Sequence, residues 1–397
     1  MSNHITSEEN IARNADVYKN AYLVDPSPQA IEPFDKEWGV AISGNTPNPS
    51  PFERINKILE ITTKSTNGFV PPEAAELITE AYESHSGEPP LLKRAYSMEN
   101  ILLNAPIYIF PHELIVGNLC CDKKGAPVFP EFGFNWVVDE IRDGLMGYSE
   151  KRTHDYFAHT EDTQQRLEKL RGFWDGNTIA DLVNSMVTDE LVKGSHDGKG
   201  VFFADAYMYC GAGHLGLEYD RLLRLGLGGI GEEIDKNAAK LGLKNPEDIK
   251  KGTFYKAAKI VNDACEKHIL RYVDRALEFA AAEMDAMRAQ ELREIAEICR
   301  HISSNPPRTF REALQLMTFA TDFVLMECNG HSVSYGRFDQ YMYPFYQRDI
   351  ETGANTREGM QELIENFYIK IWDLNKLRNH ILIKTFGNGG IDRKSVV

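Results

Sequence analysis

The longest amphipathic pattern in the sequence runs through residues 255–302 and constrains the chain to a largely helical fold. Its apolar stripe comprises Val261, Cys265, Ile269, Tyr272, Ala276 and Phe279, which recur at intervals of three or four residues. This spacing places the side chains on one face of an α-helix. We expect a break in the pattern near Gln290.

Four further segments carry helix signals. Residues 51–65 and 72–85 each place a proline in the first turn and then space apolar residues by three or four. After the Asn305-Pro306-Pro307 break, Thr309 and Glu312 have the spacing of a capping box for a helix that ends near residue 329. Residues 357–374 predict another helix. The proline-rich residues 1–50 predict an irregular arm.

Residues 101–136 break the helical pattern. Short apolar runs at 107–110 and 114–116 are separated by glycines and prolines, which predicts strand and loop. Residues 112–116 begin like a zincin motif, but Val116 stands where the second histidine is required. We therefore expect no zinc site and no other bound metal.

Charge and apolar patterning exclude several classes of protein. The net charge is −15 and the sequence contains no Lys/Arg-rich run, which argues against nucleic acid as a partner. No run of about 18 apolar residues and no secretion signal is present, so we expect no membrane partner and a cytoplasmic protein. The 6 cysteines are too sparse for a disulfide scaffold.

Residues 226–231 read GLGGIG, the glycine spacing that binds a dinucleotide when it links a strand to a helix. The preceding residues 218–225 have helical spacing instead. We therefore predict that these glycines end one helix and begin another, with the dinucleotide site as the alternative.

His214 and His331 each follow a glycine-containing stretch, where the backbone can approach a ligand closely. From spacing alone, a histidine in such a setting is more often a capped or core residue than a ligand-binding one.

Three ordered segments carry a family resemblance: residues 306–315 (PPRTFREALQ), 327–332 (ECNGHS) and 336–344 (GRFDQYMYP). Supporting segments are 114–118 (LIVGN), 127–132 (PVFPEF), 211–214 (GAGH) and 373–376 (DLNK). Together they resemble the glycyl radical enzymes, the pyruvate formate-lyase-like family. The resemblance implies an α/β fold, of which this chain would be the N-terminal portion of a ten-stranded α/β barrel, mostly helical in this part.

Within that family the motifs are most similar to those of glycerol and propanediol dehydratases. The resemblance implies that His214 and His331 are catalytic proton-transfer groups and that Ser332 binds a substrate hydroxyl. It implies radical dehydration of a small diol such as glycerol or propane-1,2-diol. The alternatives are a choline-type C–N lyase, a C–S lyase, a formate C-acetyltransferase and a non-catalytic scaffold or binding protein. Tyr335 departs from the dehydratase pattern, in which a proline is expected, and this departure predicts a different substrate pocket.

Charged residues in these segments have simpler interpretations. We interpret Arg337 and Asp339 as a structural motif, an internal ion pair that orders its loop. Arg308, Arg311 and Glu312 are interpreted as a solvated helix face. Cys120-Cys121 resembles the adjacent relay cysteines of pyruvate formate-lyase, but it stands in the first third of the chain, and we interpret the pair as buried.

The family's thiyl-cysteine motif Gly-Cys-x-Glu and its radical-glycine motif Arg-Val-x-Gly-Tyr do not occur in the sequence. We expect residues 51–391 to be a truncated catalytic domain that is inactive and poorly soluble alone, and residues 392–397 to be a non-native tail. The resemblance implies no bound organic cofactor, a small polar organic substrate, a homodimer at full length, and a glycyl radical installed by an iron–sulfur, S-adenosylmethionine-dependent activating enzyme.

Overall fold

A computed structural model describes residues 50–64, 68–147, 156–188, 190, 211, 215–242, 245–329 and 333–380. The expected N-terminal arm, apart from Ser50, and the expected tail at 392–397 lie outside these described residues.

Helix dominates the described residues, as the sequence predicts. The N-terminal helices are α3 (Glu53–Lys64), α4 (Glu73–Ser84), α5 (Pro90–Asn104), α6 (Asn135–Arg142), α7 (Glu161–Trp174) and α8 (Ile179–Met186). The C-terminal helices are α10 (Tyr219–Ala238), α11 (Pro246–Ala282), α12 (Ala286–Ile302), α13 (Phe310–Cys328), α14 (Phe338–Glu351) and α15 (Arg357–Asp373). The helices expected at 51–65, 72–85, 309–329 and 357–374 are confirmed as α3, α4, α13 and α15, with ends that differ by two residues at most.

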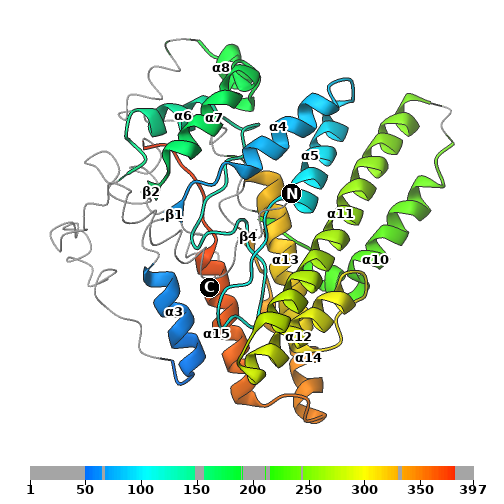
Figure 1. The fold of residues 1–397 in the computed structure, drawn as a ribbon. Coiled ribbons are helices and arrows are strands. Elements are labelled where there is room, and N and C mark those ends of the chain that lie inside the picture. The colour runs from blue at the N-terminus through cyan, green and yellow to red at the C-terminus, as the bar shows by residue number, and fades with distance from the viewer. Residues whose placement is uncertain are drawn as a thin grey trace.

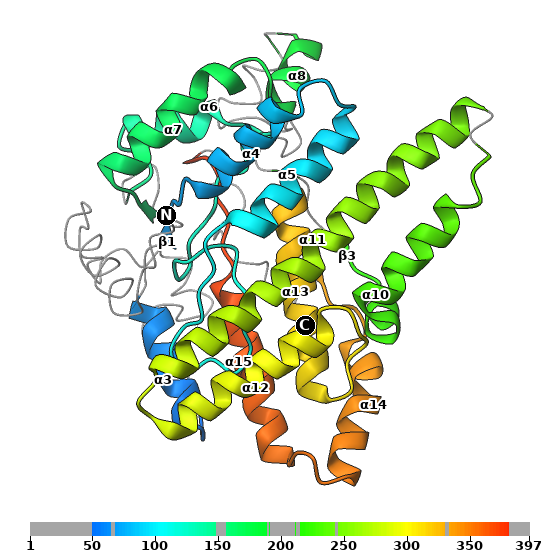
Figure 2. The same cartoon turned by 45° about the vertical axis from the view of Figure 1, so that its right-hand side comes forward.

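Helix α13 lies in the middle of the molecule and contacts α10, α12, α14 and α15 (Figures 1 and 2). Fifteen of its 19 residues are buried, and this explains why its sequence is apolar on more than one face. Thr309 caps its first turn by accepting a hydrogen bond from the Glu312 amide at 3.2 Å, which confirms the predicted cap. The other half of the box differs, because the Glu312 carboxylate accepts from the Arg308 amide at 2.6 Å.

The long pattern at 255–302 is two helices, but their junction was predicted at the wrong place. Helix α11 ends at Ala282 and α12 begins at Ala286, several residues before Gln290. Asp285 marks the new start, since its side chain accepts hydrogen bonds from the amides of Met287 and Arg288. An aspartate N-cap was the signal in the sequence.

Strands are few among the described residues. β1 (Gly68–Phe69) pairs in parallel with β2 (Phe157–Ala158), and β3 (Leu215–Gly216) pairs in parallel with β4 (Val333–Ser334). Both pairs join segments that are distant in sequence. The ten-stranded barrel stays a prediction, because the described strands form only these two pairs.

The segment between α5 and α6 is buried but contains no strand, contrary to the strand prediction for 107–110 and 114–116. Side-chain amides satisfy its backbone instead. The Asn366 Oδ1 atom accepts from the amides of Leu114 and Ile115, both at 2.9 Å. Gln315 accepts from the Val116 amide at 2.9 Å and donates to the Val116 carbonyl at 2.5 Å. These bonds replace a strand ladder.

The glycines at 226–231 end one helix and begin another, as predicted. Helix α10 is kinked at Gly226, which has φ +65° and ψ 175°. A Cβ atom at Gly226 would lie 2.6 Å from the Pro306 nitrogen, and the Gly228 amide donates to the Ser304 carbonyl at 2.8 Å. The absence of side chains at these glycines therefore leaves room for the 304–306 loop. Because a helix and not a strand precedes them, the strand-to-helix turn that binds a dinucleotide is absent here.

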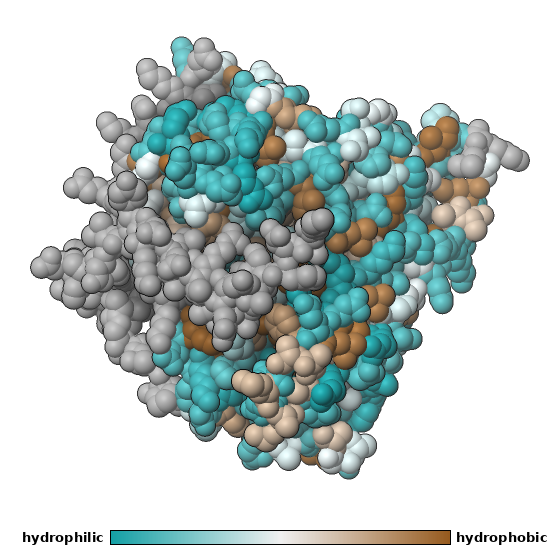
Figure 3. Space-filling model, in the orientation of Figure 1, coloured by the Kyte–Doolittle hydropathy of each residue, from teal (hydrophilic) through white to brown (hydrophobic). Residues whose placement is uncertain are grey.

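Helix α10 and the N-terminal part of α11 pack side by side and project from the body, whereas the rest of α11 packs on α5 and α12 (Figures 1 and 2). The face in Figure 3 is largely hydrophilic, with apolar patches that lie apart from one another. The exposed apolar residues of α11 are Ile249, Phe254, Leu270 and Leu277. Among the residues that the structure describes, no helix is both long and apolar enough to cross a bilayer.

The Gln315 contacts make a direct test possible. Replacing Gln315 with Leu removes the partners of the Val116 amide and carbonyl, and each orphaned buried group costs about 1–3 kcal/mol. We expect Gln315→Leu to lower the free energy of unfolding by about 2–4 kcal/mol in urea denaturation. Gln347→Leu, at an exposed position of α14, is the control and should change stability little. Equal effects of the two variants would contradict this account.

Candidate functional site

The residues proposed from the sequence to act on substrate, His214, His331 and Ser332, lie outside the described residues. They belong to two three-residue segments, 212–214 and 330–332, whose bounding residues are all described. The site is therefore built from these bounding residues.

The bounding residues come together at both ends of the two segments. At the near end, a Cβ atom at Gly211 would clash with the Cys328 carbonyl oxygen and lie 3.0 Å from the Asn329 carbonyl oxygen, and Gly211 has φ +86°. Only glycine fits this conformation and this close approach. At the far end, Leu215 of β3 pairs with Val333 of β4. Two segments more than 100 residues apart in sequence thus begin and end beside one another.

Asn329 is the residue from which the second segment departs. It caps α13 in the left-handed conformation, with φ +46° and ψ 38°. Asparagine is one of the few residues other than glycine that adopts this conformation at low cost. The turn out of α13 is therefore specified by the sequence.

A layer of aromatic side chains packs beside β4. Tyr335 is buried, its hydroxyl lies 3.2 Å from the Thr321 hydroxyl, and its ring stacks on Tyr219 with centroids 5.4 Å apart. The Tyr219 hydroxyl lies 3.0 Å from the same Thr321 hydroxyl, and the Tyr341 hydroxyl donates to the Tyr335 carbonyl at 2.7 Å. Tyr335, which stands where the dehydratase pattern has a proline, therefore adds an aromatic ring and a hydroxyl to the interior next to the strand pair.

Four buried charged residues form a cluster, which we call the buried charge cluster: Glu113, Lys123, Lys370 and Asp373. The Lys123 ammonium lies 2.6 Å from Glu113 and 2.9 Å from Asp373. Burial opposes its charge, but Asp373 and Glu113 outweigh this effect and raise the pKa of Lys123. Lys370 lies 3.3 Å from Glu113 and donates to Asn118 at 2.7 Å. Burial lowers the pKa of Lys370.

Asp322 is a fifth buried ionisable group beside this cluster. Two lysines already offset two carboxylates, and neither carboxylate oxygen of Asp322 has a hydrogen-bond partner among the described residues. Burial raises the pKa of Asp322 to about 8, a shift that Lys370 opposes and that Asp373 and Glu113 reinforce. Gly117 makes room for this group, because a Cβ atom there would lie 2.6 Å from Asp322 Oδ2. The raised pKa favours the protonated, uncharged form of Asp322 near neutral pH.

The predicted charged motifs are only partly as expected. Arg337 and Asp339 form an ion pair at 3.1 Å, but each side chain is 69% exposed, so the pair is not internal. The solvated face assigned to Arg308, Arg311 and Glu312 is wrong for two of these residues. Glu312 is buried, and the Arg311 side chain is largely buried and donates to the Leu114 carbonyl at 3.1 Å. Helix α13 is surrounded by other elements, which leaves few of its positions in solvent.

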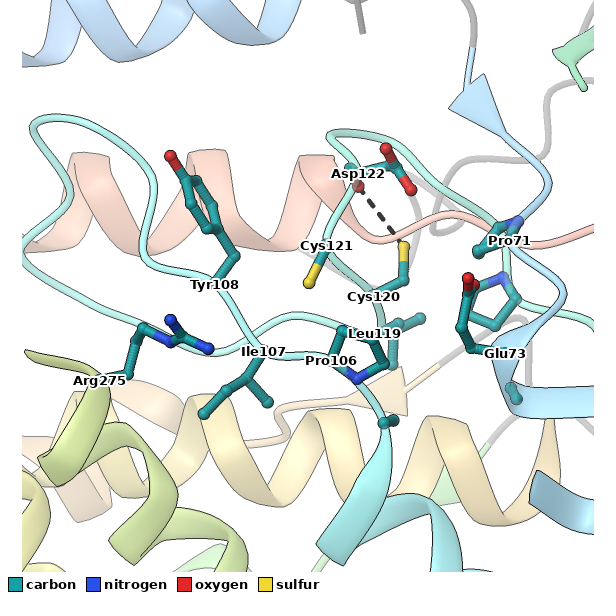
Figure 4. A pocket seen from close by; sticks show the side chains of 13 residues that line it. Pro71, Glu73, Pro106, Ile107, Tyr108, Leu119, Cys120, Cys121, Asp122 and Arg275 are labelled. Carbon is teal, nitrogen blue, oxygen red and sulfur yellow. Dashed lines mark hydrogen bonds between the residues drawn. The ribbon is translucent and has the colours of Figure 1, made fainter. Parts of the chain in front are cut away.

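Cys120 and Cys121 are half-buried rather than buried, because they line a cavity of about 130 Å³ between α4, α11 and the 106–122 segment (Figure 4). Their sulfur atoms point in different directions (Figure 4). Cys120 Sγ lies 3.5 Å from the Asp122 carbonyl oxygen. Burial raises the pKa of Cys120 well above its usual value, so it is a thiol and not a nucleophilic thiolate at pH 7. No group of three or more metal-ligating side chains occurs within the described part of the chain.

The buried charge cluster and Asp322 were not predicted. The signal in the sequence was a charged residue inside an apolar run, as in Leu114-Ile115 beside Glu113 or Ile369-Lys370-Ile371. Such a residue is either paired in the interior or exposed on one face, and spacing alone does not distinguish the two.

Comparisons with known proteins agree with this architecture. A family described as pyruvate formate lyase-like matches residues 46–392. The (2S)-3-sulfopropanediol dehydratase of Klebsiella oxytoca is 36% identical over 374 residues, covering 91% of this chain and 45% of that protein. An isethionate sulfite-lyase of Nitratidesulfovibrio vulgaris is 30% identical over 325 residues, covering 80% of this chain and 38% of that protein.

A solved structure extends the comparison to the fold. The glycerol-bound B12-independent glycerol dehydratase of Clostridium butyricum superposes with a TM-score of 0.80 at 36% identity, covering 88% of this chain and 43% of that chain. The chain therefore spans less than half the length of the relatives that it matches.

Asp322 predicts a pH dependence of stability. Its pKa is raised in the folded chain, so its proton stabilises the fold fully below about pH 4 and this contribution is lost as the pH rises through about 8. Asp322→Asn is neutral throughout. Relative to the unsubstituted chain, we expect the free energy of unfolding of Asp322→Asn to increase by about 1 kcal/mol for each pH unit between about pH 4 and about pH 8. Denaturant titrations at several pH values measure the difference.

Asp220→Asn, which changes an exposed carboxylate of α10, is the control for that experiment. A pH-independent difference for Asp322→Asn, like that of the control, would show that Asp322 is ionised in the fold.

Gly211 provides a test of the contact between the two segments. In Gly211→Ala, the added Cβ meets the carbonyls of Cys328 and Asn329 in a backbone conformation that alanine rarely adopts. We expect a loss of about 1–3 kcal/mol in the free energy of unfolding. Gly216→Ala is the matched control, since a Cβ there meets nothing within 4 Å. Thermal melts that do not separate the two variants would contradict the close approach.

Proposed function

The chain belongs to the pyruvate formate lyase-like family of glycyl radical enzymes, and from this premise we propose that it is the N-terminal part of a radical dehydratase of a small diol. The two dehydratases match at 36% identity and the sulfite-lyase at 30%. The higher identity to the sulfopropanediol and glycerol dehydratases supports a dehydratase of a small diol.

The observation that carries the proposal is the paired boundary of the two histidine segments. Gly211 packs against Asn329 before the segments, and Leu215 pairs with Val333 after them. Each segment has only three residues between its two boundaries. This arrangement supports the action of His214 and His331 on one substrate.

The proposed roles follow from the chemistry of dehydration. Loss of water from a diol radical needs a base for the hydroxyl that stays and an acid for the hydroxyl that leaves. Imidazole can perform either role near neutral pH, so His214 and His331 are the proton-transfer groups. The Ser332 hydroxyl anchors a substrate hydroxyl through a hydrogen bond.

The remaining parts of the reaction belong to the rest of the proposed enzyme. A thiyl cysteine, its glutamate and the radical glycine would lie beyond this chain in a ten-stranded barrel. A radical S-adenosylmethionine activating enzyme would install the glycyl radical, and the complete enzyme would be a homodimer. These components are inferred from the family and not from the described residues of this chain.

The coding sequence downstream of codon 391 is the first test. Continuation into a Gly-Cys-x-Glu motif supports the proposal, whereas a stop codon at this point in many independent genomes would support a scaffold protein. The complete protein, activated without oxygen, should then convert glycerol or propane-1,2-diol to an aldehyde. Cleavage of choline or isethionate, or acetyl transfer to formate, in place of diol dehydration would reject the dehydratase.

His331 gives the most direct mutational test. In the complete enzyme, we expect His331→Gln to lower kcat/KM for the diol by about 10²-fold or more, because a proton-transfer group is lost. The glycyl radical signal in electron paramagnetic resonance should keep its intensity. Arg337→Gln, in the exposed ion pair, is the control and should retain activity. Full activity of His331→Gln would exclude the proposed role.

A further inference from the structure

Three buried side chains in the interior have polar atoms without a hydrogen-bond partner among the described residues. These atoms are both carboxyl oxygens of Asp322, the hydroxyl of Tyr272 and the Nδ2 atom of Asn118. None of the three residues is more than 8% exposed, so bulk solvent does not reach these atoms. In native proteins, buried polar atoms almost always pair with protein groups or with bound water, because an unpaired one retains the full cost of its desolvation.

The three side chains surround the same place in the interior. A Cβ atom at Gly117 would lie 2.6 Å from Asp322 Oδ2 and 3.4 Å from the Phe319 ring, so the carboxyl lies against the backbone that leads into Asn118. The Tyr272 ring packs on the same Phe319 ring, with centroids 5.1 Å apart. Burial, and after it the carboxyl of Asp322, raises the pKa of the Tyr272 hydroxyl, which places these two groups near one another.

The Asn118 amide defines what a ligand here must accept. Its Oδ1 atom accepts a hydrogen bond from the Lys370 ammonium at 2.7 Å. An ammonium can only donate, so this contact fixes the orientation of the amide and leaves Nδ2, a pure donor, as its unpaired atom. The carboxyl of Asp322 has at least one oxygen that can only accept, and the Tyr272 hydroxyl can do either.

The charges around the site favour a neutral ligand over an ion. The two lysines and two carboxylates of the buried charge cluster offset one another. Arg271, which precedes Tyr272 in α11, donates to carbonyls at the end of α5 instead. A cation cannot accept from Asn118 Nδ2, and an anion cannot donate to a carboxyl oxygen of Asp322. A small neutral molecule that both donates and accepts can satisfy all three side chains.

We propose that Asp322, Tyr272 and Asn118 form an internal site that binds water. At least one water molecule donates to a carboxyl oxygen of Asp322 and accepts from Asn118 Nδ2 or from the Tyr272 hydroxyl. The ligand is small because α11, α13, α15 and the segment between α5 and α6 enclose the site. This inference goes beyond the proposed function and does not rest on it, since no step of it requires a substrate or a radical.

A crystal structure of the complete protein, which need not be activated, is the test. We expect electron density for a water oxygen within about 3.2 Å of the Asp322 carboxyl and of Asn118 Nδ2 or the Tyr272 hydroxyl. Crystals grown in a rubidium salt identify a cation by its anomalous signal. An anomalous peak at this place, no density, or a direct hydrogen bond between Asp322 and Tyr272 would each overturn the proposal.

Oxygen-17 relaxation dispersion of water counts long-lived internal water molecules without a crystal. Asp322→Leu in the complete protein should release at least one of them. Tyr219→Phe is the matched control and should release none, because the hydroxyl that it removes already lies 3.0 Å from the Thr321 hydroxyl. An unchanged count in Asp322→Leu would contradict the site.

The crystal structure of the unsubstituted protein decides the question if Asp322→Leu does not fold. A protein that binds this water but converts no diol would reject the proposed function alone.

Discussion

The buried charge cluster is the interaction on which the rest of the interior depends. Glu113, Lys123, Lys370 and Asp373 tie the irregular segment between α5 and α6 to the last turns of α15. A buried ion pair is a weak source of net stability, but removal of one partner leaves an uncompensated charge in the interior. The cluster therefore specifies one arrangement of its segments more than it strengthens the fold. Helix α13 packs against α15 and binds the same irregular segment through Gln315 and Val116.

The helices were predictable because local signals define them. Proline and glutamate at the start of α4, Thr309 before α13 and the spacing of apolar residues in α11 all act within one or two turns. The junction between α11 and α12 was misplaced because the apolar period continues across it, whereas its cause, the Asp285 cap, is a single residue. The family resemblance also came from the sequence, and the comparisons confirm it.

The candidate site was predicted only as separate motifs. Nothing in the sequence places Gly211 against Asn329 or Leu215 beside Val333, because these contacts join segments more than 100 residues apart. The burial of Glu312 and Asp322 was missed for the same reason. A charged residue on a helix is exposed or buried according to what packs on that face. The partners of α13 are α10, α12, α14, α15 and the irregular segment with Val116 and Gly117. The catalytic roles of His214, His331 and Ser332 stay predictions.

The side-chain amides that bind the 114–116 backbone have a consequence for the order of folding. A strand ladder or a helix can satisfy its amides as soon as a neighbouring segment forms. Here the partners, Gln315 and Asn366, lie 199 and 252 residues away from the groups that they bind. Closing such long loops is entropically costly, and the amides gain nothing until α13 and α15 are docked. The segment with Gly117 and Asn118 is therefore among the last parts of the interior to become ordered, and it does so together with the charged groups beside it.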